Sequence, residues 1–238
     1  MTVAAVVLAA SVSSALADAA GVARVRRIAD AAWAGGATPI VVVAPDPDGL
    51  VALALAGAPV TLAAPALREG AHGGPVDQIA RGIDLAMAEV SGTEAALVWP
   101  ARLCWAGPET VTSLIEAHGM DREALLRPAY RDEAGWPALL PVDALEAFRA
   151  LSPTSMPDDL LAGIVSSGAA ALRTIDLGDP GTVIDGATPR DELPPYDGPT
   201  EPAAPHTHEW GAAVAATTEE APLSGPALAP YEPAEATE

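Results

Sequence analysis

The segment VAAVVLAASVSSALADAAGVARVRRIADAAWAGGATPIVVVA, residues 3–44, decides the fold. It begins with the apolar run Val3–Ala10 and ends with the β-branched run Pro39–Ala44, and both runs are typical of strands buried on two faces. Between them, Ala19–Gly35 carries apolar residues at helical spacing and ends at a pair of glycines. A strand, a helix and a strand in this order predict a parallel pair joined by a crossover helix.

The N-terminal run has a second interpretation, as a secretory signal, because Ala-Leu-Ala precedes Asp18 in the manner of a cleavage site. A secretory signal needs a basic n-region, whereas the first basic residue here is Arg24. The run is also too short to span a bilayer. We therefore expect a buried first strand and a cytoplasmic protein.

The rest of the chain continues to alternate apolar runs with amphipathic stretches. Residues 76–90 have the clearest helical period. Predicted helices also cover 49–55, 108–119, 143–151 and 158–168, and predicted strands cover 59–64, 94–99, 124–130 and 170–177. This alternation predicts a three-layer α/β/α domain with a mostly parallel, Rossmann-like sheet over residues 1–193.

The charge balance limits the function classes. The chain has 32 acidic and 12 basic residues, every basic one an arginine, and a formal net charge of -20 at pH 7. A nonspecific nucleic-acid binder needs a basic face, and docking on anionic lipid needs a basic patch, so we expect neither partner. Cys104 is the sole cysteine, which excludes a disulfide framework and a multi-thiolate metal site.

The composition changes at Pro194. Residues 194–238 contain eight acidic residues, no basic residue and dense proline, alanine and threonine. Such a segment has too little apolar surface to order itself. We expect a disordered tail or one that docks on a partner protein.

The most specific stretch, IDLGDPGTVIDGATPRDEL, spans residues 175–193. It predicts a strand, a tight turn, a short apolar run and a helical turn. Asp185 ends the apolar run, where a carboxylate could face a cleft outside the sheet and bind a metal ion. The alternative is a group of side chains that only cap backbone N–H groups.

Four phrases in chain order resemble the nucleotidyltransferases related to the molybdenum-cofactor guanylyl- and cytidylyltransferases. They are the first strand from Val3, the glycine-rich loop 68–75 before a helix, the turn Gly135-Trp136-Pro137 before an apolar run, and the phrase DGATPRDEL at 185–193. The resemblance implies the nucleotidyltransferase fold. In the family it also implies transfer of a nucleotide with the help of Mg²⁺.

The chain departs from the family at three places. The family's first strand runs into a loop of the form GxSxRMGxxK, which wraps and neutralises phosphates, whereas residues 10–18 here contain neither glycine nor a basic residue. The family's Mg²⁺-binding aspartate follows the strand at 94–99, and its position here holds Arg102. Trp136 stands where the family often has histidine, and we expect it on the cleft wall.

These departures predict a catalytically degenerate relative that acts as a binding, assembly or accessory protein and needs no cofactor. The resemblance implies that its partner protein is linked to molybdenum-cofactor enzymes. Arg102, Trp136 and Asp185 are the expected cleft residues, with Arg102 and Asp185 forming a partly buried ion pair. The alternative is an active nucleotidyltransferase that holds Mg²⁺ through Asp185 and turns an arginine of residues 24–27 to the phosphates.

Overall fold

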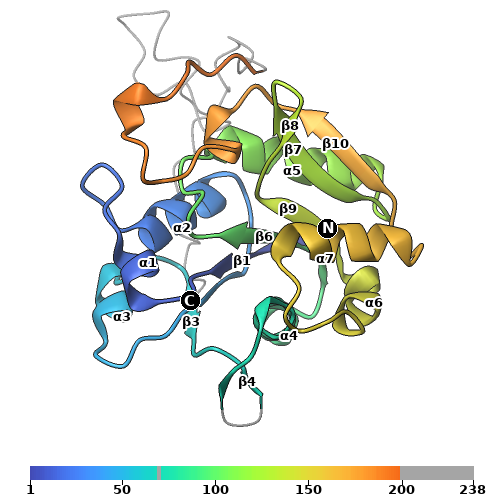
Figure 1. The fold of residues 1–238 in the computed structure, drawn as a ribbon, viewed down its shortest axis with the longest axis horizontal. Helices are drawn as coiled ribbons and strands as arrows, with labels where there is room; N and C mark the ends of the chain where they lie inside the picture. Colours follow the sequence, from blue (N-terminus) through green and yellow to red (C-terminus); the bar gives the residue numbers. More distant parts are fainter. Residues whose placement is uncertain (69–70, 199–238) are drawn as a thin grey trace, which may run out of the picture. The chain divides into compact units, whose positions relative to one another are not determined.

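A mixed, mostly parallel sheet runs through the computed structural model of the protein, which describes residues 1–68 and 71–198 (Figure 1). The strands are β1 (Thr2–Leu8), β2 (Ile40–Val43), β3 (Thr61–Ala63), β4 (Leu67–Arg68), β5 (Ala71–His72), β6 (Thr93–Pro100), β7 (Leu125–Tyr130), β8 (Glu133–Ala134), β9 (Ala138–Pro141) and β10 (Leu172–Asp176). The helices are α1 (Val12–Leu16), α2 (Arg24–Ala34), α3 (Leu50–Ala54), α4 (Pro75–Glu89), α5 (Pro108–Met120), α6 (Leu145–Arg149) and α7 (Pro157–Ser166). Short 3₁₀ turns lie at η1 (Val142–Ala144), η2 (Pro180–Thr182) and η3 (Arg190–Glu192).

The strand order in the main sheet is β10-β7-β9-β6-β1-β2-β3, with β8 paired to β7. β1 runs parallel to β2 and β6, and β10 runs parallel to β7. β9 is antiparallel to both of its neighbours, β6 and β7. The predicted α/β class and the mostly parallel sheet are confirmed, while β9 was not predicted because a four-residue apolar run ending in proline carries no readable period.

Helices cover both faces of the sheet, and the alternation of β1 shows how. Ala5 and Val7 point into a core shared with α1, α2, α3 and α5. Ala4 and Val6 point into the opposite core, shared with α4, α6 and α7. Gly82 of α4 lies directly over Val6, and any Cβ there would overlap the valine side chain, so glycine sets how closely α4 packs on the sheet.

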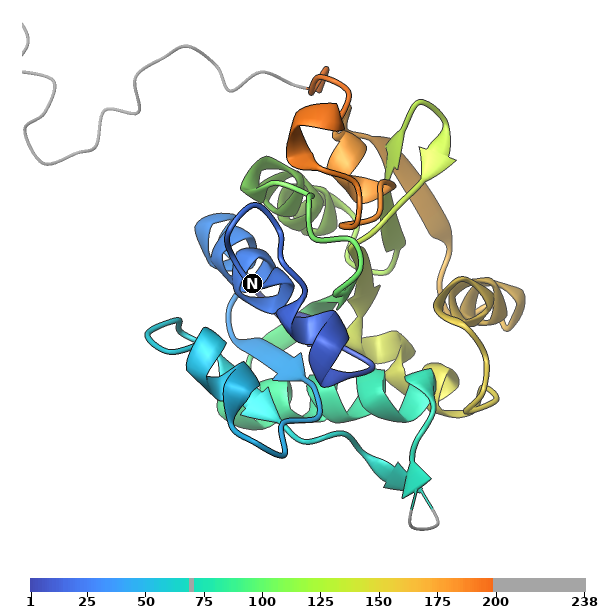
Figure 2. The same ribbon diagram turned by 60° about the vertical axis from the view of Figure 1, so that its left-hand side comes forward.

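Three local features differ from the prediction. A short helix, α1, follows β1 where a loop is expected, because a serine pair caps it as described below. The helix expected from Ala19 starts at Arg24, since Ala20 and Gly21 form a turn with φ of 54° and 82°. The glycine-rich loop 68–75 contains part of the β4–β5 hairpin, which projects from the sheet and is visible in Figure 2.

The described chain stays on this domain beyond Leu193. The Asp197 N–H donates to the Gly178 carbonyl at 3.0 Å. The compact unit containing the sheet accordingly runs from Met1 to Pro199. The remainder of the predicted tail lies outside the described residues, and its role in docking a partner stays a prediction. None of the helices formed by residues 1–68 and 71–198 is both long and apolar enough to cross a membrane.

Candidate functional site

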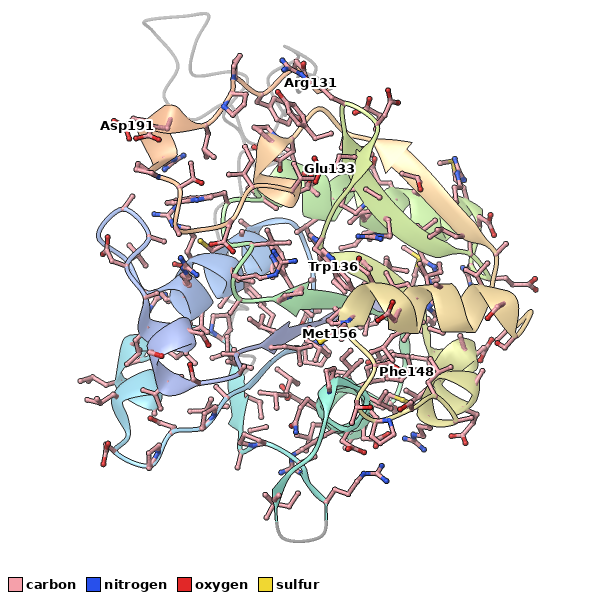
Figure 3. All side chains as sticks on the ribbon, viewed as in Figure 1. Arg131, Glu133, Trp136, Phe148, Met156 and Asp191 are labelled. Atoms are coloured by element: carbon pink, nitrogen blue, oxygen red, sulfur yellow. The ribbon has the colours of Figure 1, made fainter. Side chains whose placement is uncertain are left out.

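A cleft of about 450 Å³ opens where three parallel strands end. The sheet register brings Leu8 of β1 beside Val43 of β2 on one side and Pro100 of β6 on the other, and all three line the cleft. Ligands of open α/β sheets bind outside the carboxyl ends of the strands, so this is the candidate site. The second half of the chain contributes Met156, just before α7 in Figure 3.

The wall of the cleft is mostly apolar. Its described lining residues are Leu8, Ala9, Ala10, Ser14, Val43, Pro65, Gly73, Gly74, Pro75, Gln78, Pro100, Ala101, Arg102, Met156 and Pro157. The Gln78 amide is already engaged, because it donates to the carbonyls of Ala66 and Gly73 at 3.1 and 2.7 Å. Arg102 is the single charged residue among the described lining residues.

The turn after β1 closes on itself through two serines. The Ser11 hydroxyl accepts a hydrogen bond from the Ser14 N–H at 3.1 Å, and the Ser14 hydroxyl accepts one from the Ser11 N–H at 3.1 Å. The Ser14 hydroxyl also donates to the Ser11 carbonyl at 2.9 Å. This capping box satisfies two amide groups at the start of α1, those of Ser11 and Ser14, which are then not available to an anion.

The amino end of α4 also faces the cleft and is also capped. The Asp77 carboxylate accepts from the Gly74 N–H at 3.1 Å and from Arg68 Nε at 3.0 Å. The hydrogen bond from Arg68 is the main reason that the pKa of Asp77 lies below its usual value. The Gly74 N–H at this helix end is therefore already engaged by a carboxylate, whose charge Arg68 balances.

Arg102 and Asp185 meet at the rim of the cleft. Arg102 Nη1 lies 3.9 Å from Asp185 Oδ2, and the two side chains are 57% and 44% exposed. The predicted pairing is thus present, with Arg102 exposed and Asp185 half-buried. The two residues reach the rim from segments held together by a backbone hydrogen bond, from the Gly186 N–H to the Arg102 carbonyl at 2.7 Å.

A second arginine reaches Asp185 from the protein side. Arg24 Nη2 lies 3.7 Å from Asp185 Oδ1, and the Arg24 side chain is only 12% exposed. Its Nε is buried and has no hydrogen-bond partner among the described residues. Arg24 packs beside Cys104, which is fully buried, and this burial raises the pKa of the thiol. Arg24 thus forms an ion pair with Asp185 and is not among the residues lining the cleft.

Trp136 lies in the core, and its predicted place on the cleft wall was wrong. The side chain is 2% exposed, packs in the core on the α4 side of the sheet, and is not a lining residue of the cleft. The Arg127 guanidinium stacks 5.2 Å from the centre of the indole and donates to the Gly135 carbonyl at 3.0 Å. The Trp136 N–H donates to the Thr182 carbonyl at 2.9 Å. The backbone of Trp136 is thus held by Thr182, and its indole lies in the core beside Arg127.

The surroundings of Asp185 disfavour a Mg²⁺ ion. Within residues 1–68 and 71–198, no three histidine, cysteine, aspartate or glutamate side chains gather closely enough to hold a metal. Asp185 is flanked by two arginines, and its Oδ1 accepts from the Ala187 N–H at 2.8 Å. Mg²⁺ needs oxygen ligands in near-octahedral geometry, and positive neighbours oppose it.

Sequence reasoning missed two parts of the site. The Ser11-x-x-Ser14 spacing is a capping-box pattern, and the sequence alone was enough to predict it. Met156 and Pro157 carry no such signal, since only the tertiary fold brings them to the carboxyl ends of β1 and β6.

The sheet order defines an α/β Rossmann-like fold, and solved structures that include nucleotidyltransferases share it. A nucleotidyl transferase from Methanothermobacter superposes with a TM-score of 0.57 and 18% identity, over 72% of this chain and 87% of that one. A cytidylyltransferase acting on 2-C-methyl-D-erythritol 4-phosphate, from Thermus thermophilus, gives 0.57 and 16%, over 80% and 95%. Rv0371c from Mycobacterium tuberculosis, in a complex with manganese, gives 0.55 and 17%, over 74% and 89%.

Sequence comparison identifies the family. Residues 5–170 match the MobA-like NTP transferase domain, and the chain belongs to this family. Asp185 lies beyond the matched residues. No curated protein matches the chain significantly in sequence.

Proposed function

We propose that the chain is a non-catalytic NTP transferase-like protein that works by binding, as an accessory or assembly protein in the cytoplasm. The observation that carries the proposal is the reciprocal capping of Ser11 and Ser14 at the carboxyl end of β1. Backbone N–H groups at such a strand-to-helix turn are what hold a phosphate in this fold class. Here the Ser14 and Ser11 hydroxyls occupy two of them, the N–H groups of Ser11 and Ser14.

The charges around the cleft support the same proposal. A nucleoside triphosphate brings several negative charges, and each buried one needs a partner. Among the described lining residues the cleft offers one cation, Arg102, which already faces Asp185, and the chain as a whole carries a net charge of -20. Arg102 also stands at the position where the family resemblance places the Mg²⁺ ligand, so both the metal and the phosphates lose their sites.

The partner side of the proposal rests on analogy. Relatives of the molybdenum-cofactor guanylyl- and cytidylyltransferases serve enzymes that carry this cofactor, and we propose such enzymes or their maturation proteins as partners. The acidic segment 194–238 is the proposed docking element. A protein that binds rather than reacts needs no cofactor of its own.

Calorimetric titration with GTP and with CTP, each with Mg²⁺, tests the proposal. We expect no binding tighter than about 100 μM, which corresponds to roughly -5.5 kcal/mol. The variant Arg102→Asp separates two causes of this loss, because it restores a carboxylate at the metal position while the serine-capped turn stays closed. We expect this variant not to bind nucleotide either.

The alternative is a divergent active enzyme. It predicts a Mg²⁺-dependent dissociation constant below about 100 μM for the native chain. It also predicts that Asp185→Ala abolishes that binding, since Asp185 would be the remaining metal ligand. Either result would overturn the non-catalytic proposal.

A further inference from the structure

We propose that the cleft at the ends of β1, β2 and β6 binds a small molecule with an apolar body and a single negative charge. This inference rests on the proposed function, because it names what a nucleotidyltransferase cleft can bind once the phosphate and metal sites are lost. The ligand class follows from the volume, the lining and the one charged group of the cleft.

The volume suits a small organic molecule. The cleft measures about 450 Å³, and small-molecule sites commonly enclose about 300–1,000 Å³ with mostly apolar walls and few polar groups. It is bounded by strand ends on one side and by the start of α4 and the loop before α7 on the others. A concave site with these walls removes most of a ligand's surface from water.

The lining selects an apolar body. Leu8, Val43 and Pro65 come from the sheet side, and Met156 and Pro157 come from the loop and first turn of α7. Each square ångström of apolar ligand surface buried here contributes about 25 cal/mol. Methionine adapts to ligands of different shape, because its side chain is unbranched and flexible.

Arg102 selects the charge. Its side chain is 57% exposed, and its contact with Asp185 is a long one at 3.9 Å. No hydrogen bond engages its guanidinium within the described part of the chain. The group can therefore donate to a carboxylate or sulfonate at the rim, in the two-pronged geometry that arginine favours.

Other features exclude more than one negative charge. Asp77 caps the start of α4 at the opposite side of the cleft, and Ser14 and Ser11 engage each other's amides. Asp185 at the rim adds a further negative charge beside Arg102. A monoanion meets the one cation among the described lining residues, whereas the further charges of a triphosphate meet no second cation there.

The experiment compares two fluorescent probes that differ in charge. The anionic probe is 1-anilinonaphthalene-8-sulfonate, and the uncharged one is N-phenyl-1-naphthylamine. We expect the native full-length chain to bind both, and dodecanoate to displace the anionic probe. Arg102→Gln should weaken the anionic probe at least fivefold and change the uncharged probe less than twofold.

Matched variants locate the binding. Ala10→Phe places a ring in the cleft from an exposed position of its lining and should weaken both probes at least tenfold. The controls Arg173→Gln on β10 and Ala52→Phe on α3 change exposed residues outside the cleft and should leave both affinities within twofold. Circular dichroism of each variant confirms that it is folded.

Three results would each overturn the inference: no probe binding by the native chain, binding of the anionic probe that Arg102→Gln does not weaken, or binding that Ala10→Phe does not weaken. Displacement of the probe by GTP or CTP with Mg²⁺ at micromolar concentration would instead overturn the proposed function. The two failures are thus separable, since one concerns the charge dependence of an apolar ligand and the other concerns nucleotide.

Discussion

The Asp179 carboxylate caps a helix whose N-cap residue lies 72 residues earlier in the chain: its Oδ2 accepts from the Gly107 N–H at 2.9 Å, just before α5. The same oxygen accepts from the Thr110 hydroxyl at 2.7 Å, and Oδ1 accepts from the Gly181 N–H at 2.8 Å. One side chain, 6% exposed, therefore caps both α5 and the η2 turn. It joins the stretch after β10 to the helix after β6.

Removing this carboxylate should destabilise the domain strongly. Asp179→Ala leaves several buried donors without an acceptor, and hydrogen bonds to a charged group contribute about 1.5–3 kcal/mol each before relaxation. We expect a loss of about 2–4 kcal/mol in the free energy of unfolding, measured with urea. Asp176→Ala is the matched control, because its exposed carboxylate accepts one hydrogen bond, from the Gly178 N–H, and should cost less than about 1 kcal/mol. Equal losses would show that the capping is not what stabilises this region.

The Arg102–Asp185 pair should contribute little to stability. Arg102 is exposed, Asp185 is half-buried, and their contact is long at 3.9 Å, whereas even well-formed exposed ion pairs are typically worth only about 0.2–1 kcal/mol. We expect a coupling energy below about 1 kcal/mol in the double-mutant cycle of Arg102→Met and Asp185→Ala. The parallel cycle with Arg24→Met should give a larger coupling, because the Arg24 side chain is 12% exposed and a buried charge depends more on its partner. The reverse order would mean that Asp185 pairs mainly at the rim.

Stability should fall on mild acidification because of His118. This α5 residue is 1% exposed, and neither ring nitrogen has a hydrogen-bond partner among the described residues. Burial is the main reason that the pKa of His118 lies below its ordinary value of about 6.5, with Glu94 and Asp121 opposing and Arg122 adding to the shift.

The sign of the pH effect follows from that shift. Above about pH 6.5 the imidazole is neutral in both the folded and the unfolded chain, and its contribution to stability is fully present. As the pH falls from about 6.5 toward the folded-state pKa, the unfolded chain takes up the proton first, so stability is lost. Urea unfolding at pH 7 and pH 5 should show this loss reduced in both His118→Leu and His118→Gln. An unchanged pH dependence in both variants would assign the loss to carboxylates.

The C-terminal segment should matter to stability only up to Gly198. Residues 194–198 hold the Asp197–Gly178 hydrogen bond, and Gly198 lies close against Leu177 and Gly178. Truncation after Gly198 should leave the melting temperature within a few degrees. Truncation after Leu193 should lower the melting temperature further, because the free energy of unfolding falls by about 1 kcal/mol or more when the hydrogen bond of Asp197 is lost. If the longer protein is clearly more stable than the chain ending at Gly198, the remaining tail contributes to the fold.

Much of the sheet could be predicted because its strands are continuous apolar runs and α4 has a clean helical period. β9 could not, since its pairing with β6 and β7 depends on the fold. Arg102 and Asp185 were brought together by the order of family-like phrases, while their exposure depends on packing that no local pattern encodes. Trp136 illustrates the limit, because an indole in a turn can face a cleft or the core, and only the tertiary packing shows that it faces the core.

Because β9 follows its neighbour β6 by 37 residues in the chain, the strands of the sheet cannot all pair at the same stage of synthesis. β1, β2, β3 and β6 can pair once residue 100 has left the ribosome, but the far edge of β6 keeps its backbone groups unpaired until residues 138–141 emerge. An open apolar edge is a place where nascent chains join one another. The time needed to translate the 37 residues between β6 and β9 is therefore the time during which the edge of β6 is open to association with other chains. Slower translation of these residues would lengthen it.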